Sequence, residues 1–335
     1  MTQAPSFSSI TVIGGGAWGT ALANLAAHNG IDVLIWAREP EVADAINARH
    51  ENTVFLKGAP LHEALRATSQ LDEAAGREAF LFVVPAQFAR PILAALSVRA
   101  GARPVALCSK GIERETGLMM TDVLAETWPE AIPAILSGPS FARDVAKGLP
   151  TAVTLACPDP ELGGRWTATL AAPHFRLYLS DDLVGAELGG AVKNVLAIAA
   201  GAVEGRGLGE SARAALIARG FAEFQRLGVA LGAKPQTMAG LSGLGDLILT
   251  ACSPQSRNMS LGLELGRGRG LEEILGERNT VSEGVASAAA VARLAEKAGV
   301  DMPICNAVRA LVAGERTVDE IAAELLARPL KAEAG

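Results

Sequence analysis

The sequence predicts an α/β domain with a mainly parallel sheet, followed by a domain made of helices alone. Up to residue 182, short β-rich runs alternate with helical patterns, which is typical of parallel α/β sheets. A glycine-rich turn of the form G-x-G-x-x-G joins the first strand to the first helix. After Asp181 the strand runs stop. We therefore expect an N-terminal domain over residues 1–182 and an all-α C-terminal domain over residues 183–335.

Seven β-rich runs predict the strands of the first domain. They cover residues 8–14, 31–37, 79–85, 103–109, 134–138, 151–157 and 175–180. Apolar periodicity predicts helices over residues 17–29, 183–203, 212–231 and 285–298. A last helix should begin after Thr317, which forms a capping-box pattern with Glu320.

The composition limits the classes of function. The chain has 335 residues, of which 50% are hydrophobic and 20% charged, so a large core is expected. A net charge of −6 argues against a nucleic-acid or anionic-membrane binder. The four cysteines form no CxxC pair and the four histidines are scattered, so we expect no metal site and no disulfide framework. The N-terminus lacks a signal-peptide pattern, and Glu187 and Lys193 interrupt the longest apolar stretch, which predicts a cytoplasmic protein without membrane insertion.

The glycine-rich turn GGGAWG has the pattern of a dinucleotide-binding site. Gly14 would allow the tight turn, Gly16 the approach of backbone to a pyrophosphate, and Gly19 the close packing of helix on strand. The helix N-terminus would offer free N–H groups to the phosphates. A turn without a ligand is the alternative, but the position between a strand and a helix favours the dinucleotide.

The end of the second predicted strand bears on the choice of cofactor. An acidic residue is expected there for the ribose of NAD, but the sequence has Arg38. Because a guanidinium can hold a 2′-phosphate, we infer that NADPH is accepted. Alternatively, Arg38 is a solvated side chain that pairs with Glu39 or Glu41.

Three further segments carry candidate site residues. Lys110 follows a predicted strand at the sheet edge where ligands bind, although it could equally be a surface lysine. Gly138, Pro139 and Ser140 form a loop after the next strand, which faces the same edge or is an ordinary turn. Residues 241–258 contain Asp246 flanked by glycines and then Ser256, Arg257 and Asn258; this segment is a ligand site or a polar loop between helices.

The apolar run GGAVKNVLAIAAG, residues 189–201, contains a lysine at its centre. Either Lys193 extends along its methylene groups to water, or a functional pocket lies beside it. On a helical wheel it shares a face with Ala186, Gly190, Ala197 and Ala200. These small side chains would leave room for a ligand, which favours the pocket.

Taken together, these segments resemble the bacterial NAD(P)-dependent glycerol-3-phosphate dehydrogenases. The motifs GGGAWGTA, IWAR, SKGIE, SGPSFA, LGGAVKNVLAIAAG, GLGDLILT, QSRN and VSEG occur in the family's order over nearly the whole chain. Gly15 and Ala17 stand where the family often has alanine and serine, so a side-chain contact to phosphate is missing at Ala17.

The resemblance implies reversible reduction of dihydroxyacetone phosphate to sn-glycerol 3-phosphate with NADPH or NADH. Lys193 would be the proton donor and acceptor, oriented and tuned by Lys110 and Asp246. The residues implied to bind the cofactor are Gly14, Gly16, Ala17, Trp18, Gly19, Arg38, Lys110, Gly138, Ser140, Ala142, Ser256, Arg257, Val281 and Glu283. Those implied to bind the substrate are Lys110, Gly138, Lys193, Asn194, Asp246, Ser256, Arg257 and Asn258. The family further suggests a homodimer and a role in glycerophospholipid synthesis.

Two alternatives remain at this point. A dehydrogenase acting on a β-hydroxyacid or ketopantoate would also place a lysine on the first helix of the second domain, usually with its asparagine one turn later. Here Asn194 directly follows Lys193, which favours the glycerol-phosphate interpretation. A non-catalytic NAD(P)H sensor would not require Lys110, Lys193 and Asp246 together.

Overall fold

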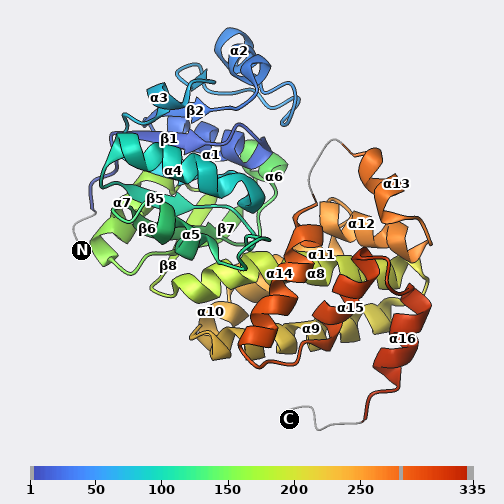
Figure 1. Cartoon of the computed structure of the whole chain (residues 1–335). Helices are drawn as coiled ribbons and strands as arrows, with labels where there is room; N and C mark the ends of the chain where they lie inside the picture. The colour runs from blue at the N-terminus through green and yellow to red at the C-terminus, as the bar shows by residue number, and fades with distance from the viewer. Residues whose placement is uncertain (1–3, 279–281, 330–335) are drawn as a thin grey trace. The chain divides into compact units, whose positions relative to one another are not determined.

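The computed structural model describes residues 4–278 and 282–329 (Figure 1). The chain divides into two compact units, Met1–Gly190 with Gly232–Asp246, and Ala191–Leu231 with Leu247–Gly335. Helix α8, Leu183–Gly205, contributes residues to both. The domain boundary predicted after residue 182 stays a prediction.

The first unit contains an eight-stranded sheet in the order β3-β2-β1-β4-β5-β6-β7-β8. Its strands are β1 Ser9–Ile13, β2 Asp32–Trp36, β3 Arg66–Thr68, β4 Ala79–Phe82, β5 Pro104–Leu107, β6 Ile132–Ser137, β7 Thr151–Ala156 and β8 Phe175–Ser180. All seven predicted strands are confirmed. The short strand β3 was not predicted.

The connectivity creates a natural ligand-binding edge. All neighbouring strands are parallel except β6 and β7, so the expected mainly parallel sheet is confirmed. Strand β1 pairs with both β2 and β4, and the strand order reverses at this point. In open α/β sheets, ligands bind beyond the carboxyl ends of the strands at such a reversal.

Helices cover both faces of this sheet, as Figure 1 shows. Alternate side chains of each strand point to opposite faces, so that Ile10 and Val12 of β1 join one apolar cluster and Ile13 joins the other. The first cluster includes side chains of α1 Ala17–His28, α2 Pro40–Arg49, α6 Ala142–Ala146 and α7 Pro160–Leu170. The second includes side chains of α3 Leu71–Ala74, the short helix η1 Ala86–Phe88, α4 Ala89–Ala100 and α5 Met120–Thr127.

Every secondary-structure element described in the second unit is a helix, which confirms the expected all-α region. Besides part of α8, these are α9 Glu210–Ala230, α11 Asp246–Cys252 (from its second residue on), α12 Arg257–Gly266, α13 Leu271–Gly276, α14 Glu283–Lys297, α15 Pro303–Val312 and α16 Val318–Leu326. The predicted capping box is confirmed, because the Thr317 side chain accepts from the Glu320 N–H and Glu320 accepts from the Thr317 N–H.

Glycines bring α8 and α12 into contact backbone to backbone. A Cβ at Gly201 would lie 2.0 Å from the carbonyl oxygen of Met259. Reciprocally, a Cβ at Gly262 would lie 2.0 Å from the carbonyl oxygen of Ile198. Gly201, the last residue of the run around Lys193, therefore serves helix packing here.

Helix α8 is the one candidate membrane span among the described residues, by length and composition only. However, 89% of its apolar window is buried inside the protein, as in a core helix.

The interpretation of residues 241–258 as a polar loop is wrong for most of the segment. Leu241–Gly245 forms a π-helical turn after the short helix α10, Pro235–Ala239, and α11 follows directly. A Cβ at Gly243 would lie 1.9 Å from the carbonyl oxygen of Met238, so tight packing against α10 explains a glycine at this position.

Candidate active site

The glycine-rich turn lies between β1 and α1, and its three motif glycines have different surroundings. Gly14 has a φ of +126°, and a Cβ there would lie 3.0 Å from the backbone of Val83. A Cβ at Gly19 would lie 2.0 Å from the Gly14 carbonyl oxygen. By contrast, a Cβ at Gly16 meets no described heavy atom within 4 Å. The turn is therefore closed on the protein side and open at Gly16, at the N-terminus of α1, which fits a dinucleotide pyrophosphate.

A buried asparagine that the sequence analysis missed fixes this turn. The Nδ2 of Asn52 donates to the carbonyl oxygen of Gly15 and to Oγ1 of Thr20, both at 2.8 Å. Its Oδ1 accepts from the N–H of Phe55 at 2.9 Å. Asn52 is fully buried, so these hydrogen bonds satisfy an amide that water cannot reach.

Ala17 and Trp18 begin α1 directly after the turn and pack, partly buried, on the sheet. The Nε1 of Trp18 is buried, and no described group accepts a hydrogen bond from it.

Arg38 follows β2, and its side chain is 73% exposed. Its Nε and Nη2 both donate to Oε1 of Glu39, at 3.1 and 2.7 Å. The pairing with Glu39 that the sequence left open is therefore present. An exposed pair of this kind is weak, so it leaves the guanidinium able to exchange partners.

Lys110, Gly138 and Asp246 meet at the carboxyl end of the sheet. The Nζ of Lys110 donates to Oδ2 of Asp246 at 2.8 Å and to the carbonyl oxygen of Gly138 at 3.2 Å. The side chain of Asp246 is 1% exposed and that of Lys110 is 17% exposed. The ammonium therefore lies at the end of the sheet with one buried counter-ion fixed beside it, so it is no ordinary surface lysine.

Glycines on α8 and after β6 make this arrangement possible. A Cβ at Gly190 would lie 3.3 Å from Cγ of Lys110, so a larger residue would press on the lysine stem. Gly138 has a φ of +151°, and a Cβ there would lie 2.9 Å from Cα of Val153. Ser140 donates to the Gly138 carbonyl oxygen at 3.2 Å, and Ala142 begins α6.

In the second unit, α8 carries Lys193 and Asn194, which are 7% and 4% exposed. Asn194 accepts at Oδ1 from Nδ2 of Asn258 at 2.8 Å. Asn258 in turn accepts from the N–H of Gly284 at 3.0 Å. The Nδ2 of Asn194 also donates to Oε2 of Glu283 at 3.5 Å. The two asparagines therefore join α8, α12 and α14.

The other predicted residues of this unit lie at the N-terminus of α12. Ser256 is the N-cap, accepting from the N–H of Met259 at 3.2 Å. Arg257 is exposed, and its carbonyl oxygen accepts from Nη1 of Arg278 at 2.9 Å. Val281 lies outside the described residues.

The buried thiols of Cys108 and Cys305 are poor candidates for chemistry. Burial raises the pKa of Cys108 to about 12 and that of Cys305 well above its ordinary value. Both thiols therefore stay protonated. Among the residues described, no three of His, Cys, Asp or Glu cluster closely enough to hold a metal ion.

A mainly parallel sheet with this turn at its point of reversal, together with a helical unit, defines a Rossmann-type dinucleotide-dependent dehydrogenase. Family models for the N-terminus and the C-terminus of NAD-dependent glycerol-3-phosphate dehydrogenase match residues 9–163 and 182–323. The chain belongs to this family, and the family and the oxidoreductase class expected from the sequence are confirmed.

Individual relatives match over almost their entire length. A glycerol-3-phosphate dehydrogenase [NAD(P)+] of Parvibaculum lavamentivorans is 56% identical, covering 98% of this chain and 99% of the relative. One from Hyphomonas neptunium is 58% identical, covering 100% and 99%. The crystal structure of a glycerol-3-phosphate dehydrogenase from Coxiella burnetii superposes with a TM-score of 0.92 at 36% identity, covering 96% of this chain and 99% of that one.

Proposed function

We propose that this enzyme reduces dihydroxyacetone phosphate reversibly to sn-glycerol 3-phosphate, using NADPH or NADH. The observation that carries the proposal is the buried Asp246 paired with Lys110 at the carboxyl end of a sheet whose glycine-rich turn fits a dinucleotide. Relatives that carry this activity in their names are more than half identical to the chain along its whole length.

The cofactor would lie on the glycine-rich turn, with Gly14, Gly16 and Gly19 shaping the turn and the first N–H groups of α1 receiving the pyrophosphate. When bound, the dihydronicotinamide supplies the hydride. Arg38 leaves Glu39 to pair with the 2′-phosphate of NADPH, since the exposed ion pair is weak. On the resemblance of the sequence motifs, we further propose Ala17, Trp18, Ser140, Ala142, Val281 and Glu283 as cofactor-binding residues.

Lys110 acts on the substrate by its charge. Its ammonium is held by Asp246 and the Gly138 carbonyl group, so it needs little reorganisation to stabilise negative charge on the reacting oxygen. The same fixed position lets Lys110 and Gly138 contact both cofactor and substrate.

Lys193 supplies the proton. As an ammonium it polarises the ketone and protonates the alkoxide oxygen during reduction, and as a free amine it accepts the hydroxyl proton during oxidation. Its burial on α8 excludes the water that would compete for that proton.

The phosphate of the substrate would be bound from the N-terminus of α12. Arg257 is exposed there and offers a guanidinium fork, beside the N-cap Ser256. Nδ2 of Asn258 donates one N–H to Oδ1 of Asn194, and the second N–H of the Asn258 amide is the group proposed for the phosphate, with Asn194 orienting that amide.

We further propose the division into functional domains after residue 182, a homodimer and a cytoplasmic location. The physiological direction is proposed to be synthesis of the glycerophospholipid backbone.

The substrate assignment is tested by initial rates of NADPH oxidation with dihydroxyacetone phosphate, ketopantoate or a β-ketoacid. We expect turnover with the triose phosphate and at least 100-fold lower kcat/KM with the other two. Turnover preferring ketopantoate or the β-ketoacid would favour the related dehydrogenases, and NADPH binding without turnover of any would favour a sensor.

A further inference from the structure

Lys110 belongs to a loop, residues 108–119, that joins β5 to α5 and is called here the lysine loop. Its first residues are tied to the end of β4, where the N–H of Cys108 donates to the Phe82 carbonyl oxygen at 2.8 Å and Oγ of Ser109 donates to that of Val84 at 2.5 Å. The function proposed above uses Lys110 from this loop. That function does not explain why Glu113, the last residue of the SKGIE motif, is buried.

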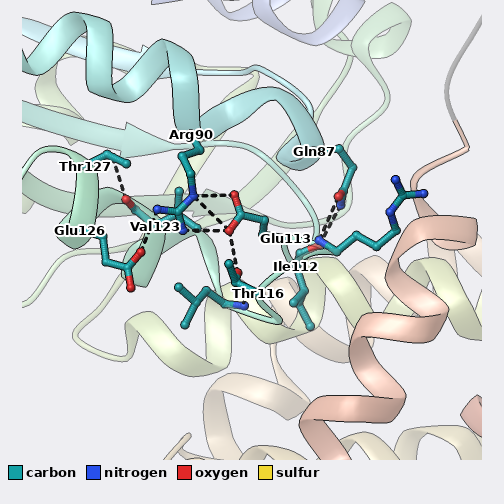
Figure 2. Close-up of polar contacts among 10 residues, drawn as sticks. Gln87, Arg90, Ile112, Glu113, Thr116, Val123, Glu126 and Thr127 are labelled. Atoms are coloured by element: carbon teal, nitrogen blue, oxygen red, sulfur yellow. Dashed lines mark hydrogen bonds and ion pairs between the residues drawn. The ribbon is translucent and has the colours of Figure 1, made fainter.

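Helices η1 and α4, which follow β4, hold the lysine loop by hydrogen bonds just beyond Lys110. Gln87 of η1 donates from Nε2 to the Ile112 carbonyl oxygen at 2.8 Å and accepts at Oε1 from the N–H of Arg114 at 2.9 Å. One side-chain amide thus holds the backbone on both sides of Glu113, as Figure 2 shows.

Glu113 itself is 8% exposed, and both of its carboxylate oxygens are engaged. Arg90 of α4 donates from Nε to Oε1 at 2.9 Å and from Nη2 to Oε2 at 2.8 Å, while Oγ1 of Thr116 donates to Oε2 at 2.6 Å (Figure 2). The hydrogen bonds from Arg90 hold the pKa of Glu113 below its usual range. This geometry is a bidentate fork, which fixes orientation as well as distance.

The segment that carries Gln87 and Arg90 begins beside the glycine-rich turn. Val83, seven residues before Arg90, is the residue whose backbone a Cβ at Gly14 would touch at 3.0 Å. Residues 83–90 therefore contact the glycine-rich turn at one end and the lysine loop at the other. Glu113 is the third residue after Lys110, a span of at most about 10 Å, so a shift at Glu113 reaches Lys110 along a short stretch of chain.

We infer that Arg90 and Glu113 are positioning residues for Lys110, fixing its ammonium relative to the dinucleotide turn. This inference rests on the role proposed for Lys110. A pair that only stabilised the fold would change the unfolding temperature but not the turnover of the folded enzyme.

The test is a double-mutant cycle between Glu113→Gln and Lys110→Met, read as kcat, KM for dihydroxyacetone phosphate, Kd for NADPH and thermal midpoint. Glu113→Gln should lower kcat about 10- to 100-fold, and any rise in the Kd for NADPH should be no larger than that caused by Lys110→Met, because the effect passes through the lysine. In the Lys110→Met background, the same substitution should change the residual kcat less than about 2-fold, because its effect passes through the lysine.

Glu126→Gln is the matched control. Glu126 accepts from Nη1 of the same Arg90 at 2.8 Å, but it is half exposed and lies on α5, outside the lysine loop. Its removal should leave kcat within about 2-fold of wild type. If Glu113→Gln does not fold, Arg90→Lys keeps the charge and removes the fork, and should lower kcat in the same way.

Two results would overturn the inference while leaving the role of Lys110 intact: wild-type kcat in folded Glu113→Gln or Arg90→Lys, or equal losses in both backgrounds of the cycle. Full activity in Lys110→Met would instead overturn the role of Lys110, and the positioning claim with it.

Discussion

Replacement of Gly16 or Gly19, at the start of α1, by alanine should have different effects: Gly19→Ala should lower stability, whereas Gly16→Ala should weaken NADPH binding. In Gly19→Ala the new Cβ would lie 2.0 Å from the Gly14 carbonyl oxygen, so the backbone must shift by about 1.3 Å to reach an ordinary C···O contact of about 3.3 Å. Such overpacking costs about 1–3 kcal/mol, and the helix propensity of alanine returns at most about 1 kcal/mol. We expect the free energy of unfolding to fall by about 1–2 kcal/mol.

Gly16→Ala meets no described atom within 4 Å, and its φ of −71° suits any residue. Its unfolding free energy should change by less than about 1 kcal/mol. However, the methyl group occupies the space assigned to the pyrophosphate, so the Kd for NADPH should rise at least about 10-fold.

Urea denaturation and NADPH fluorescence titration of the two variants provide the assay. If Gly16→Ala binds NADPH like the wild type, the turn is not the cofactor site. If Gly19→Ala is as stable as the wild type, the packing argument is wrong.

Three further predictions concern packing, pH and cofactor choice. Gly262→Ala should lower the unfolding free energy by about 1–3 kcal/mol, because its Cβ would meet backbone on α8. Gly276→Ala on α13 should be neutral, because no described atom lies within 4 Å of the added Cβ. Equal urea midpoints for the two variants would contradict this prediction. Burial raises the pKa of Glu187 to about 7 against a usual 4.5. Between these two pKa values the folded state keeps Glu187 protonated while the unfolded state does not, so the protein loses stability as pH rises from about 5 to 8. Relative to Glu187→Gln this loss should reach about 2–3 kcal/mol, and parallel pH profiles of unfolding free energy would refute it. Arg38→Ala should raise the KM for NADPH at least about 10-fold more than that for NADH, and equal losses would exclude a 2′-phosphate contact.

Local patterns in the sequence were enough to predict most of the fold. The seven longer strands, α1, α8 and the capping box at Thr317 each have a signal within a few residues, and each is present. Strand β3 has three residues and too short a pattern to show periodicity.

Features that depend on distant contacts could not be predicted. The glycine-rich segment 241–245 is helical because it packs on α10 and on Gly189 of α8. A Cβ at Gly189 would lie 2.2 Å from the Ser242 carbonyl oxygen. Such packing overrides local propensity. Asn52 donates to the Gly15 carbonyl oxygen of the glycine-rich turn from 37 residues away, in a segment without a motif. Glu113 was visible in its motif, but its partner Arg90 is 23 residues away.

The most direct test of the account is the turnover of dihydroxyacetone phosphate by wild type and Lys193→Ala at saturating NADPH. The wild type should oxidise NADPH in step with sn-glycerol 3-phosphate formation. Lys193→Ala should lose about 10²- to 10⁴-fold in kcat while binding NADPH normally, because it lacks the proton donor. A wild type without turnover, or a Lys193→Ala variant with undiminished kcat, would contradict the account.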